Sequence, residues 1–118
     1  KMLSGGTDIY LFGWASTPQL DAYALLNSVF HSKDGKKRGK WNPGGYHNPR
    51  VDDLVENIQV EIDMKKRQDM ISEAFKLQKE DYGTLALYRQ PLTWAAKSSV
   101  DALQLADNKI RLWWVSKK

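Results

Sequence analysis

The residues of this chain best suited to contact a ligand are aromatic side chains that stand beside turns. Trp14 lies two residues before the turn-forming Ser16-Thr17-Pro18, and Trp41 and Tyr46 lie on either side of Pro43-Gly44-Gly45. Aromatic rings on loops offer a large, rigid contact area and lose little conformational entropy on binding. We therefore predict Trp14, Trp41 and Tyr46 as ligand contacts, with core filling as the alternative use of each ring.

Aromatics inside periodic segments are interpreted differently. Rings on strands and helices are most often packed in the interior, so core filling is the favoured interpretation for them. The aromatics assigned to the core are Tyr10, Phe12, Phe75, Trp113 and Trp114.

No residue pattern predicts catalysis. His31 and His47 do not stand at a metal-ligand spacing, and we expect both on the surface. Asp52 and Asp53 point about 100° apart on a helix, so they cannot share one substrate atom. The sequence holds neither a Gly-x-Ser-x-Gly elbow nor a Walker phosphate loop. We predict a protein that is not an enzyme, with no cofactor and no metal site.

A basic loop supports an alternative function. The net charge is +4, and Lys33 to Lys40 is rich in basic residues and is followed by Trp41. A small nucleic-acid-binding module could use this loop on phosphates and bases. Its candidate residues are Lys36, Lys37, Arg38, Lys40 and Trp41. No recognised nucleic-acid motif accompanies the charge, so a solvated surface loop and no nucleic-acid partner is the favoured interpretation.

Length and composition set the class of protein. The 118 residues suffice for one domain or part of a larger one, and 42% hydrophobic with 27% charged residues is typical of a globular chain. No apolar run approaches the roughly 20 residues that span a bilayer. The chain has no cysteine, which excludes disulfides and thiolate metal sites.

The first half of the chain reads as a strand, a helix and a long loop. Residues 8–14 form an apolar, β-favouring run, which predicts a buried strand. Residues 21–30 carry apolar side chains at helical spacing. Residues 31–47 then form a loop of a length that is often functional.

Two helices follow with clear start signals. Asn48 can cap a helix whose first position is Pro49, and Asp63 can cap a second, longer helix. The predicted apolar stripes are Val51, Leu54, Val55 and Ile58 on the first helix, and Met70, Ile71, Ala74, Phe75 and Leu77 on the second. The two helices should pack as a hairpin that ends before Gly83.

The last part of the chain predicts strands. Residues 84–88, 92–97 and 110–115 have strand composition. The order strand, helix, helix, helix, strands indicates an α/β fold class with sheet at both ends.

The order of these motifs resembles family 5 of the solute-binding proteins of ABC transporters, the oligopeptide- and dipeptide-binding type. The resemblance covers nearly the whole chain. It rests on Gly13-Trp14 at a strand end, Asp21 at a helix start, Asn42 with Gly45-Tyr46, Asn48-Pro49 with Val51-Asp52, Asp63 with Arg67, Glu73-Ala74, Glu80-Asp81, and Leu85 to Tyr88.

The resemblance implies a fold and a location. Residues 1–118 would form a single partial domain: the C-terminal lobe segment of a type II-like periplasmic-binding-protein fold in a longer protein. Two lobes would close on a peptide or related small solute, which an ABC permease in the inner membrane then receives. The expected location is the bacterial periplasm, with membrane tethering as an option.

The resemblance also implies ligand contacts at the strand end. By position these are Gly13, Trp14, Ala15 and Thr17, with backbone groups pairing to an extended peptide. Peptide-binding members commonly have an aspartate where this chain has Thr17, which weakens a charge-assisted contact to a neutral hydrogen bond. Asp21 is the candidate to replace it, if the turn places it in the cleft.

Outside a longer protein, the chain should associate with itself. An unpaired sheet edge and an aromatic cleft face would be exposed, which predicts a dimer or a strand-exchanged oligomer. Solute binding should be weak, because half of the cleft would be absent.

Overall fold

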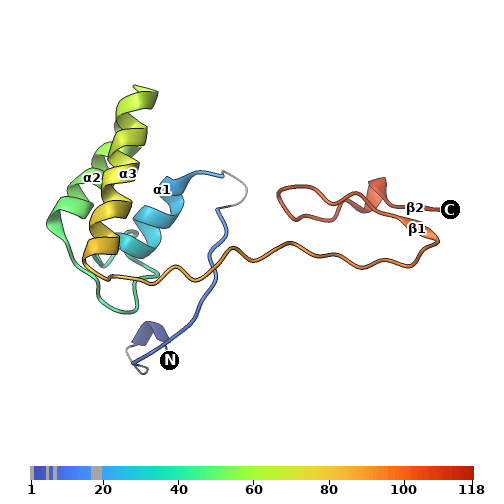
Figure 1. The fold of residues 1–118 in the computed structure, drawn as a ribbon, viewed down its shortest axis with the longest axis horizontal. Helices are drawn as coiled ribbons and strands as arrows, with labels where there is room; N and C mark the ends of the chain where they lie inside the picture. The colour runs from blue at the N-terminus through green and yellow to red at the C-terminus, as the bar shows by residue number, and fades with distance from the viewer. Residues whose placement is uncertain (1, 5, 7, 17–19) are drawn as a thin grey trace. The chain divides into compact units, whose positions relative to one another are not determined.

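The computed structural model describes residues 2–4, 6, 8–16 and 20–118. The chain divides into two compact units, residues 1–86 and residues 87–118. The first contains all the α-helices and the second contains the sheet (Figure 1). The elements are the 3-10 helices η1 (Met2–Ser4) and η3 (Leu112–Trp114), the π-helix η2 (Leu26–Phe30), the α-helices α1 (Ala22–Leu25), α2 (Pro49–Val60) and α3 (Met64–Glu80), and the strands β1 (Val100–Asp101) and β2 (Ser116–Lys117).

The predicted helix over residues 21–30 is confirmed as α1 running directly into η2. Asp21 caps it, because its side chain accepts a hydrogen bond from the Tyr23 amide at 2.7 Å. Leu26, Val29 and Phe30 are buried, so this helical segment lays its apolar face on the core. The edge of the Phe30 ring meets the Phe75 ring of α3, with centroids 5.7 Å apart.

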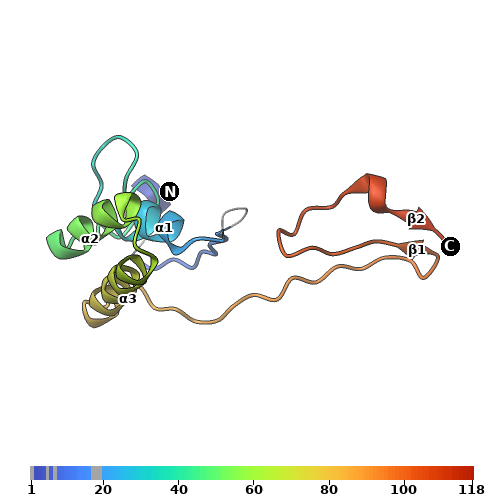
Figure 2. The same ribbon diagram turned by 90° about the horizontal axis from the view of Figure 1, so that it is seen from above.

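The predicted helix hairpin is also confirmed. α2 and α3 lie side by side with α1 against them (Figures 1 and 2). Asn48 caps α2 ahead of Pro49, and Asp63 caps α3 through the Lys66 amide. All four predicted stripe residues of α2 are buried. On α3, Ile71 and Ala74 are buried, and Met70, Phe75 and Leu77 pack against the core from its margin.

The end of α3 shows a feature that the sequence did not reveal. The Gly83 amide bonds to the Gln78 carbonyl and the Tyr82 amide to the Lys79 carbonyl, which is a Schellman motif. The left-handed position in it is held by Tyr82, at φ +53°, rather than by a glycine. Gly83 serves a different purpose: a Cβ there would lie 2.7 Å from Cδ2 of Tyr46.

The predicted buried strand over residues 8–14 is wrong. The structure assigns no strand to this segment, and Ile9 and Leu11 are exposed. Phe12 packs against the helical core and Tyr10 packs beside Phe12, with ring centroids 5.9 Å apart. A β-favouring run becomes a strand only when a second strand takes its hydrogen bonds, and none of the described residues does so here.

The strands predicted at residues 84–88, 92–97 and 110–115 are wrong for the same reason. In the second unit the only strand pairing is antiparallel and two residues long, with Val100 opposite Lys117 and Asp101 opposite Ser116. Residues 112–114 form η3 instead. Trp113 and Trp114, assigned to the core above, are exposed, because residues 87–118 form no second layer of their own over this hairpin.

These elements fit an α/β order only in outline. The assignment to a lobe of a periplasmic-binding-protein fold therefore stays a prediction. What the structure does establish is a helical core, built by η2, α2 and α3, on which the loop of residues 31–47 is mounted.

Candidate functional site

The loop of residues 31–47, which carries Trp41 and Tyr46, is tied to the helix that precedes it. The Gly39 amide donates to the Asn27 carbonyl at 2.9 Å, and the Trp41 amide donates to the Ser28 carbonyl at 2.8 Å. Gly39 has φ +60°, and a Cβ there would lie 2.5 Å from the His31 carbonyl oxygen. Only glycine fits this position, so the loop folds back tightly on its own start.

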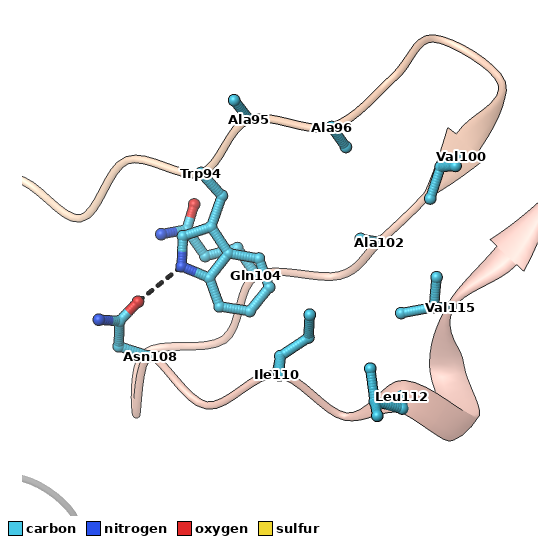
Figure 3. Close-up of a pocket in the computed structure, with 10 residues that line it drawn as sticks. All are labelled: Trp94, Ala95, Ala96, Val100, Ala102, Gln104, Asn108, Ile110, Leu112 and Val115. Atoms are coloured by element: carbon cyan, nitrogen blue, oxygen red, sulfur yellow. Dashed lines mark hydrogen bonds between the residues drawn. The ribbon is translucent and has the colours of Figure 1, made fainter.

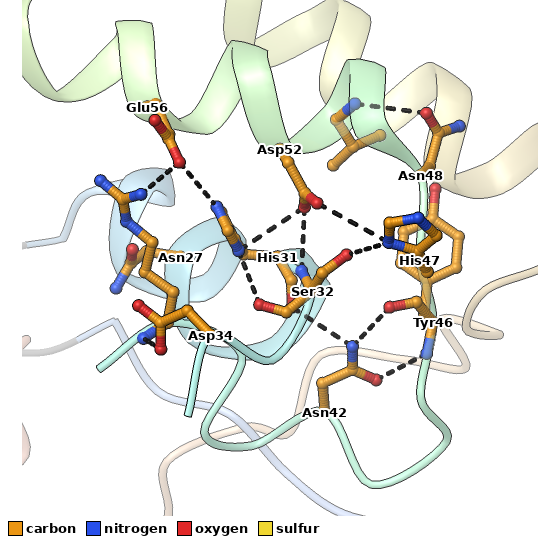
Figure 4. Close-up of polar contacts among 12 residues, drawn as sticks. Asn27, His31, Ser32, Asp34, Asn42, Tyr46, His47, Asn48, Asp52 and Glu56 are labelled. Atoms are coloured by element: carbon orange, nitrogen blue, oxygen red, sulfur yellow. Dashed lines mark hydrogen bonds and ion pairs between the residues drawn. The ribbon is translucent and has the colours of Figure 1, made fainter. Parts of the chain in front are cut away.

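Asn42 closes the second half of the loop. Its side-chain oxygen accepts from the Tyr46 amide at 2.9 Å, and its Nδ2 donates to the Tyr46 and His31 carbonyls at 2.7 and 3.2 Å (Figure 4). The side chain is buried, at 3% exposure, and all its polar atoms are paired. Asn42 therefore joins the beginning and the end of the loop.

Asp34 organises the basic part of the loop. One of its carboxylate oxygens accepts from the amides of Lys36, Lys37 and Arg38 at 2.7 to 3.0 Å. These hydrogen bonds, that of Lys36 first, lower the pKa of Asp34. Arg38 is also paired with Glu56 of α2. Part of the basic charge is thus neutralised within the loop, although Lys36 and Lys37 remain exposed.

Tyr46 contacts the protein at both ends of its ring. The ring packs against the core, and the hydroxyl donates to Oδ2 of Asp81 at 2.7 Å. Asn48 donates to the same oxygen at 2.6 Å, which joins the start of α2 to the end of α3. Burial raises the pKa of Tyr46, and hydrogen bonds from Asn48 and then Tyr46 lower the pKa of Asp81. Tyr46 therefore helps to hold the loop in place against the helices.

The two tryptophan candidates are more open. Trp14 is 36% exposed and Trp41 40% exposed, while Gly13 and Ala15 are exposed. No ring contact joins Trp14 to Trp41 or Tyr46 in the described part of the chain. Thr17 lies outside the described residues. The structure therefore leaves both tryptophan rings accessible without gathering them into one cavity.

Asp21 is engaged by the protein itself. Besides capping α1, its carboxylate accepts two hydrogen bonds from the Arg67 guanidinium, at 2.8 and 3.0 Å. Arg67 also donates to the Ile58 carbonyl, so it links α1, α2 and α3. The Tyr23 amide, and then Arg67, lower the pKa of Asp21. The motif residues Asp21 and Arg67 thus act in packing the helices.

The expectation that both histidines lie on the surface is wrong for His31 and right for His47. His31 is 5% exposed, and its two ring nitrogens face Asp52 and Glu56 of α2 (Figure 4). The His47 ring is open to solvent, and its Nδ1 lies 2.6 Å from the Ser32 hydroxyl and 3.9 Å from Asp52. The Ser32 amide donates to Asp52 as well, at 2.9 Å.

These side chains do not form a metal centre. Among the described residues, no group of three or more His, Cys, Asp or Glu side chains could hold a metal ion. The geometry around His31 gives the reason, because its two nitrogens point to different carboxylates, and Nδ1 is already 2.7 Å from the Ser32 carbonyl.

The second unit has a hollow of its own. A depression of about 620 Å³ lies inside the hairpin, where the Trp94 indole donates to the Asn108 side chain at 2.7 Å (Figure 3). Its apolar walls include Val100, Ala102, Ile110, Leu112 and Val115. Residues 87–118 contain no buried residue, so this hollow is an open apolar surface.

The roles of three loop residues, Asn42, Asp34 and His31, were not predicted from the sequence. Asn42 and Asp34 could have been found, since Asn and Asp next to Pro and Gly commonly bond to nearby backbone. Burial of His31 had no local signal, because its partners Asp52 and Glu56 lie about 20 residues further along the chain.

The part of the chain that the structure describes contains no helix of the length and apolar character that a membrane crossing requires.

Comparison with known proteins gives one informative similarity. The chain is 26% identical over 105 residues to a protein named nickel-binding protein NikA from Staphylococcus aureus (strain NCTC 8325 / PS 47). The aligned region is 89% of this chain and 20% of that protein, so the chain spans about a fifth of its relative. No protein-family model matches the chain. No solved structure matches it either. The chain is thus similar to part of a binding protein.

Proposed function

We propose that this chain is part of the solute-binding component of an ABC importer, which captures a small solute outside the cytoplasm and delivers it to a membrane permease. The observation that carries the proposal is the similarity to a named binding protein along 89% of the chain. The motif resemblance to family 5 solute-binding proteins supports the same assignment. Neither points to catalysis.

The solute proposed first is a peptide or related small molecule. This follows from the resemblance to the oligopeptide- and dipeptide-binding type, with Gly13, Trp14, Ala15, Thr17 and Trp41 near the solute. The accessible Trp14 and Trp41 rings support it. Asp21 and Tyr46 are better assigned to positioning, because their polar atoms are bound to Arg67 and Asp81.

A nickel ion is the second candidate solute. It is favoured by the name of the relative. It ranks second because the motif resemblance points to the oligopeptide- and dipeptide-binding type, whereas the described residues hold no group of three or more His, Cys, Asp or Glu side chains that could bind a metal ion. In either case the solute is cargo that the protein releases again.

The test identifies what the natural protein carries. The protein that contains this sequence is purified under native conditions, denatured, and the released material analysed by mass spectrometry and elemental analysis. A released peptide supports the first candidate, and nickel supports the second. Nucleic acid retained in a salt-sensitive way, with no small solute, would contradict the proposal and favour the basic loop of residues 36–41 as the binding site.

Substitution of Trp14 tests the proposed contact. Trp14→Ala should weaken solute binding by on the order of 1–3 kcal/mol, because truncation removes a large contact surface. Tyr82→Ala is the matched control, since Tyr82 is an exposed aromatic outside the proposed site. Equal affinity of a folded Trp14→Ala variant and the control would remove Trp14 from the site.

The 118-residue chain alone should form a dimer or a strand-exchanged oligomer. Its second unit exposes Leu112, Trp113 and Trp114, and its sheet has only two strands, so the outer edge of each is open to pairing. Sedimentation equilibrium should give a mass that rises with concentration, and Leu112→Gln should reduce the rise. A constant monomer mass at high concentration would contradict this part of the proposal.

A further inference from the structure

A depression of about 340 Å³ lies beside the basic part of the loop of residues 31–47. The loop lines it with Asp34, Lys36, Lys37 and Arg38, and α1, η2 and α2 supply the other lining residues. Each lining residue has a polar or charged side-chain group, so the depression is suited to hydrogen bonding. The proposed function gives it no role, because neither candidate tryptophan is among the residues that line it.

Lys36 and Lys37 bring unused positive charge to this depression. Both side chains are exposed, and neither ammonium group has an ion pair or a hydrogen bond among the described residues. Their backbone amides are bound to Asp34 at 2.7 and 2.9 Å, which fixes the turn that carries them. The two ammonium groups therefore stand on an ordered backbone and remain free to bind.

Two amide side chains on the helices add neutral donors. The Tyr23 hydroxyl donates to Oε1 of Gln59 at 2.9 Å, and Oδ1 of Asn27 lies 3.4 Å from the same hydroxyl. Both amide oxygens therefore face Tyr23, and the NH₂ groups of Asn27 and Gln59 have no partner in the described part of the chain. An amide NH₂ group can only donate, so the helices contribute two unused donors.

The negative groups nearby are already engaged. Oδ1 of Asp34 accepts three backbone amides, and Glu56 is paired with Arg38. The loop has three cationic side chains here against these two carboxylates, so the charge around the depression is positive. Unused donors and positive charge together favour an anion whose oxygens accept hydrogen bonds.

We propose that this depression binds a phosphate group, with Lys36 and Lys37 as the charged donors and Asn27 and Gln59 as the neutral donors. The oxygens of an ionised phosphate are strong acceptors, and a phosphate monoester carries about 1.5 to 2 negative charges at pH 7. Lysine binds phosphate as a point charge. This site goes beyond the proposed function and does not depend on which solute the protein carries.

A single phosphate group fits the depression better than a nucleic-acid strand does. Proteins that bind single strands combine positive charge with aromatic rings on which the bases stack. Trp41, the aromatic residue that follows the basic part of the loop, is not among the lining residues. The phosphate therefore belongs to a soluble compound or to the headgroup of an anionic lipid.

The direct test is a titration of the 118-residue chain with inorganic phosphate at about pH 7.5, where phosphate is mostly doubly charged. The backbone amide shifts of residues 36–39, followed by NMR, should change and reach saturation. Sodium acetate and sodium chloride at the same ionic strength should produce no saturating change. Equal changes with phosphate and chloride would overturn the proposal.

Two double variants separate a built site from net charge. Lys36→Gln/Lys37→Gln should raise the Kd for phosphate about tenfold or more, because contacts between charged groups are lost. Lys66→Gln/Lys79→Gln is the matched control, since it removes the same charge from exposed lysines of α3. An equal Kd for the two double variants would overturn the proposal.

A further pair of variants tests the amide donors. Gln59→Glu keeps the size of the side chain but replaces the NH₂ group with a negatively charged oxygen, so the saturating shifts should disappear. Gln68→Glu places the same charge at an exposed position of α3 and should retain binding. Unchanged helix content in circular dichroism shows that the variants fold. Full phosphate binding by Gln59→Glu would overturn the proposed set of donors.

Vesicles identify the source of the phosphate. Co-sedimentation with phosphatidylglycerol vesicles but not with phosphatidylcholine vesicles, reversed by inorganic phosphate, would identify a lipid headgroup. Saturating shifts with inorganic phosphate and no co-sedimentation would identify a soluble phosphate compound. The material released from the natural protein tests the proposed function separately, so either proposal can fail without the other.

Discussion

The helical unit and the C-terminal hairpin unit differ in what holds them together. In residues 1–86, Leu26, Val51, Val55 and Ile58 are completely buried, and caps close the ends of the helices. Residues 87–118 have two strands of two residues each and no buried side chain. A hairpin without a covered apolar face is marginal in water. The first unit carries its own core, whereas the second offers an apolar surface.

The polar contacts of the two units differ in the same way. In the helical unit they connect separate elements, such as Asp21 with Arg67 or Tyr46 with Asp81. In the hairpin unit one contact is local, where hydrogen bonds from Arg111 and then Lys109 lower the pKa of Asp107 to about 2, and others, such as Trp94 with Asn108, join the arms of the same hairpin. Local pairs stiffen a turn without joining layers, so they do not replace a core.

The largest contrast should come from matched truncations in the two units. Ile58→Ala should cost about 2–5 kcal/mol of unfolding free energy, because it leaves a cavity in the core. Leu112→Ala in the hairpin should change it by less than about 0.5 kcal/mol, since Leu112 is 70% exposed. Urea denaturation followed by circular dichroism measures both. A similar loss of unfolding free energy in the two variants would contradict the contrast between the two units.

A smaller loss is expected at the junction of α3 and the loop. Gly83→Ala should cost about 1–3 kcal/mol, because the new Cβ would lie 2.7 Å from the Tyr46 ring. Gly13→Ala is the control, since nothing lies within 4 Å of a Cβ at that position. Thermal unfolding of the two variants checks the difference, and equal melting temperatures would show that Tyr46 does not pack there.

The caps should contribute next. Asp21→Ala should cost about 1–2 kcal/mol and Asp63→Ala about 1 kcal/mol, since both lose a cap but only Asp21 also binds Arg67. The lowered pKa of Asp21 means that its carboxylate stabilises the fold at neutral pH and loses this effect as the pH falls. Denaturation at about pH 7 and at about pH 3 measures the unfolding free energies of Asp21→Ala and Asp63→Ala. The difference between these two free energies should be smaller in acid. A difference between the two unfolding free energies that is larger in acid would contradict the stabilising role given to the Asp21 carboxylate.

The smallest effect is a gain. Tyr82→Gly should stabilise the helical unit by about 0.5–1 kcal/mol, because glycine adopts the left-handed conformation without the steric cost that Tyr82 bears. Tyr82→Ala, which keeps a Cβ, should show no such gain. Melting temperatures distinguish them, and a stability loss in Tyr82→Gly would mean that the exposed ring makes a contact of its own.

Local signals explain which parts of the fold were predictable. Asp21, Asn48 and Asp63 are capping residues placed directly before apolar stripes at helical spacing, and all three helix starts are confirmed. The strands predicted from composition at residues 8–14 and 110–115 did not form, because a strand depends on a distant partner that composition does not specify. Helices could be predicted from neighbours along the chain, and strands could not.

The candidate site was predictable to a similar extent. The position of Trp41 and Tyr46 on a turn-rich loop is confirmed, but the role of Tyr46 as a donor to Asp81 depends on a contact 35 residues away. The burial of His31 against α2 has the same origin. Residue type suggested which side chains could contact a ligand, and only the packing distinguished framework residues from accessible ones.

Hydrogen exchange along the whole chain tests the central contrast most directly. We predict strong protection of backbone amides in α2 and α3, whose inner faces form the core, and exchange near the rate of an unfolded chain throughout residues 87–118. Protection in residues 87–118 equal to that in α2, measured at a concentration where the chain is monomeric, would contradict the account.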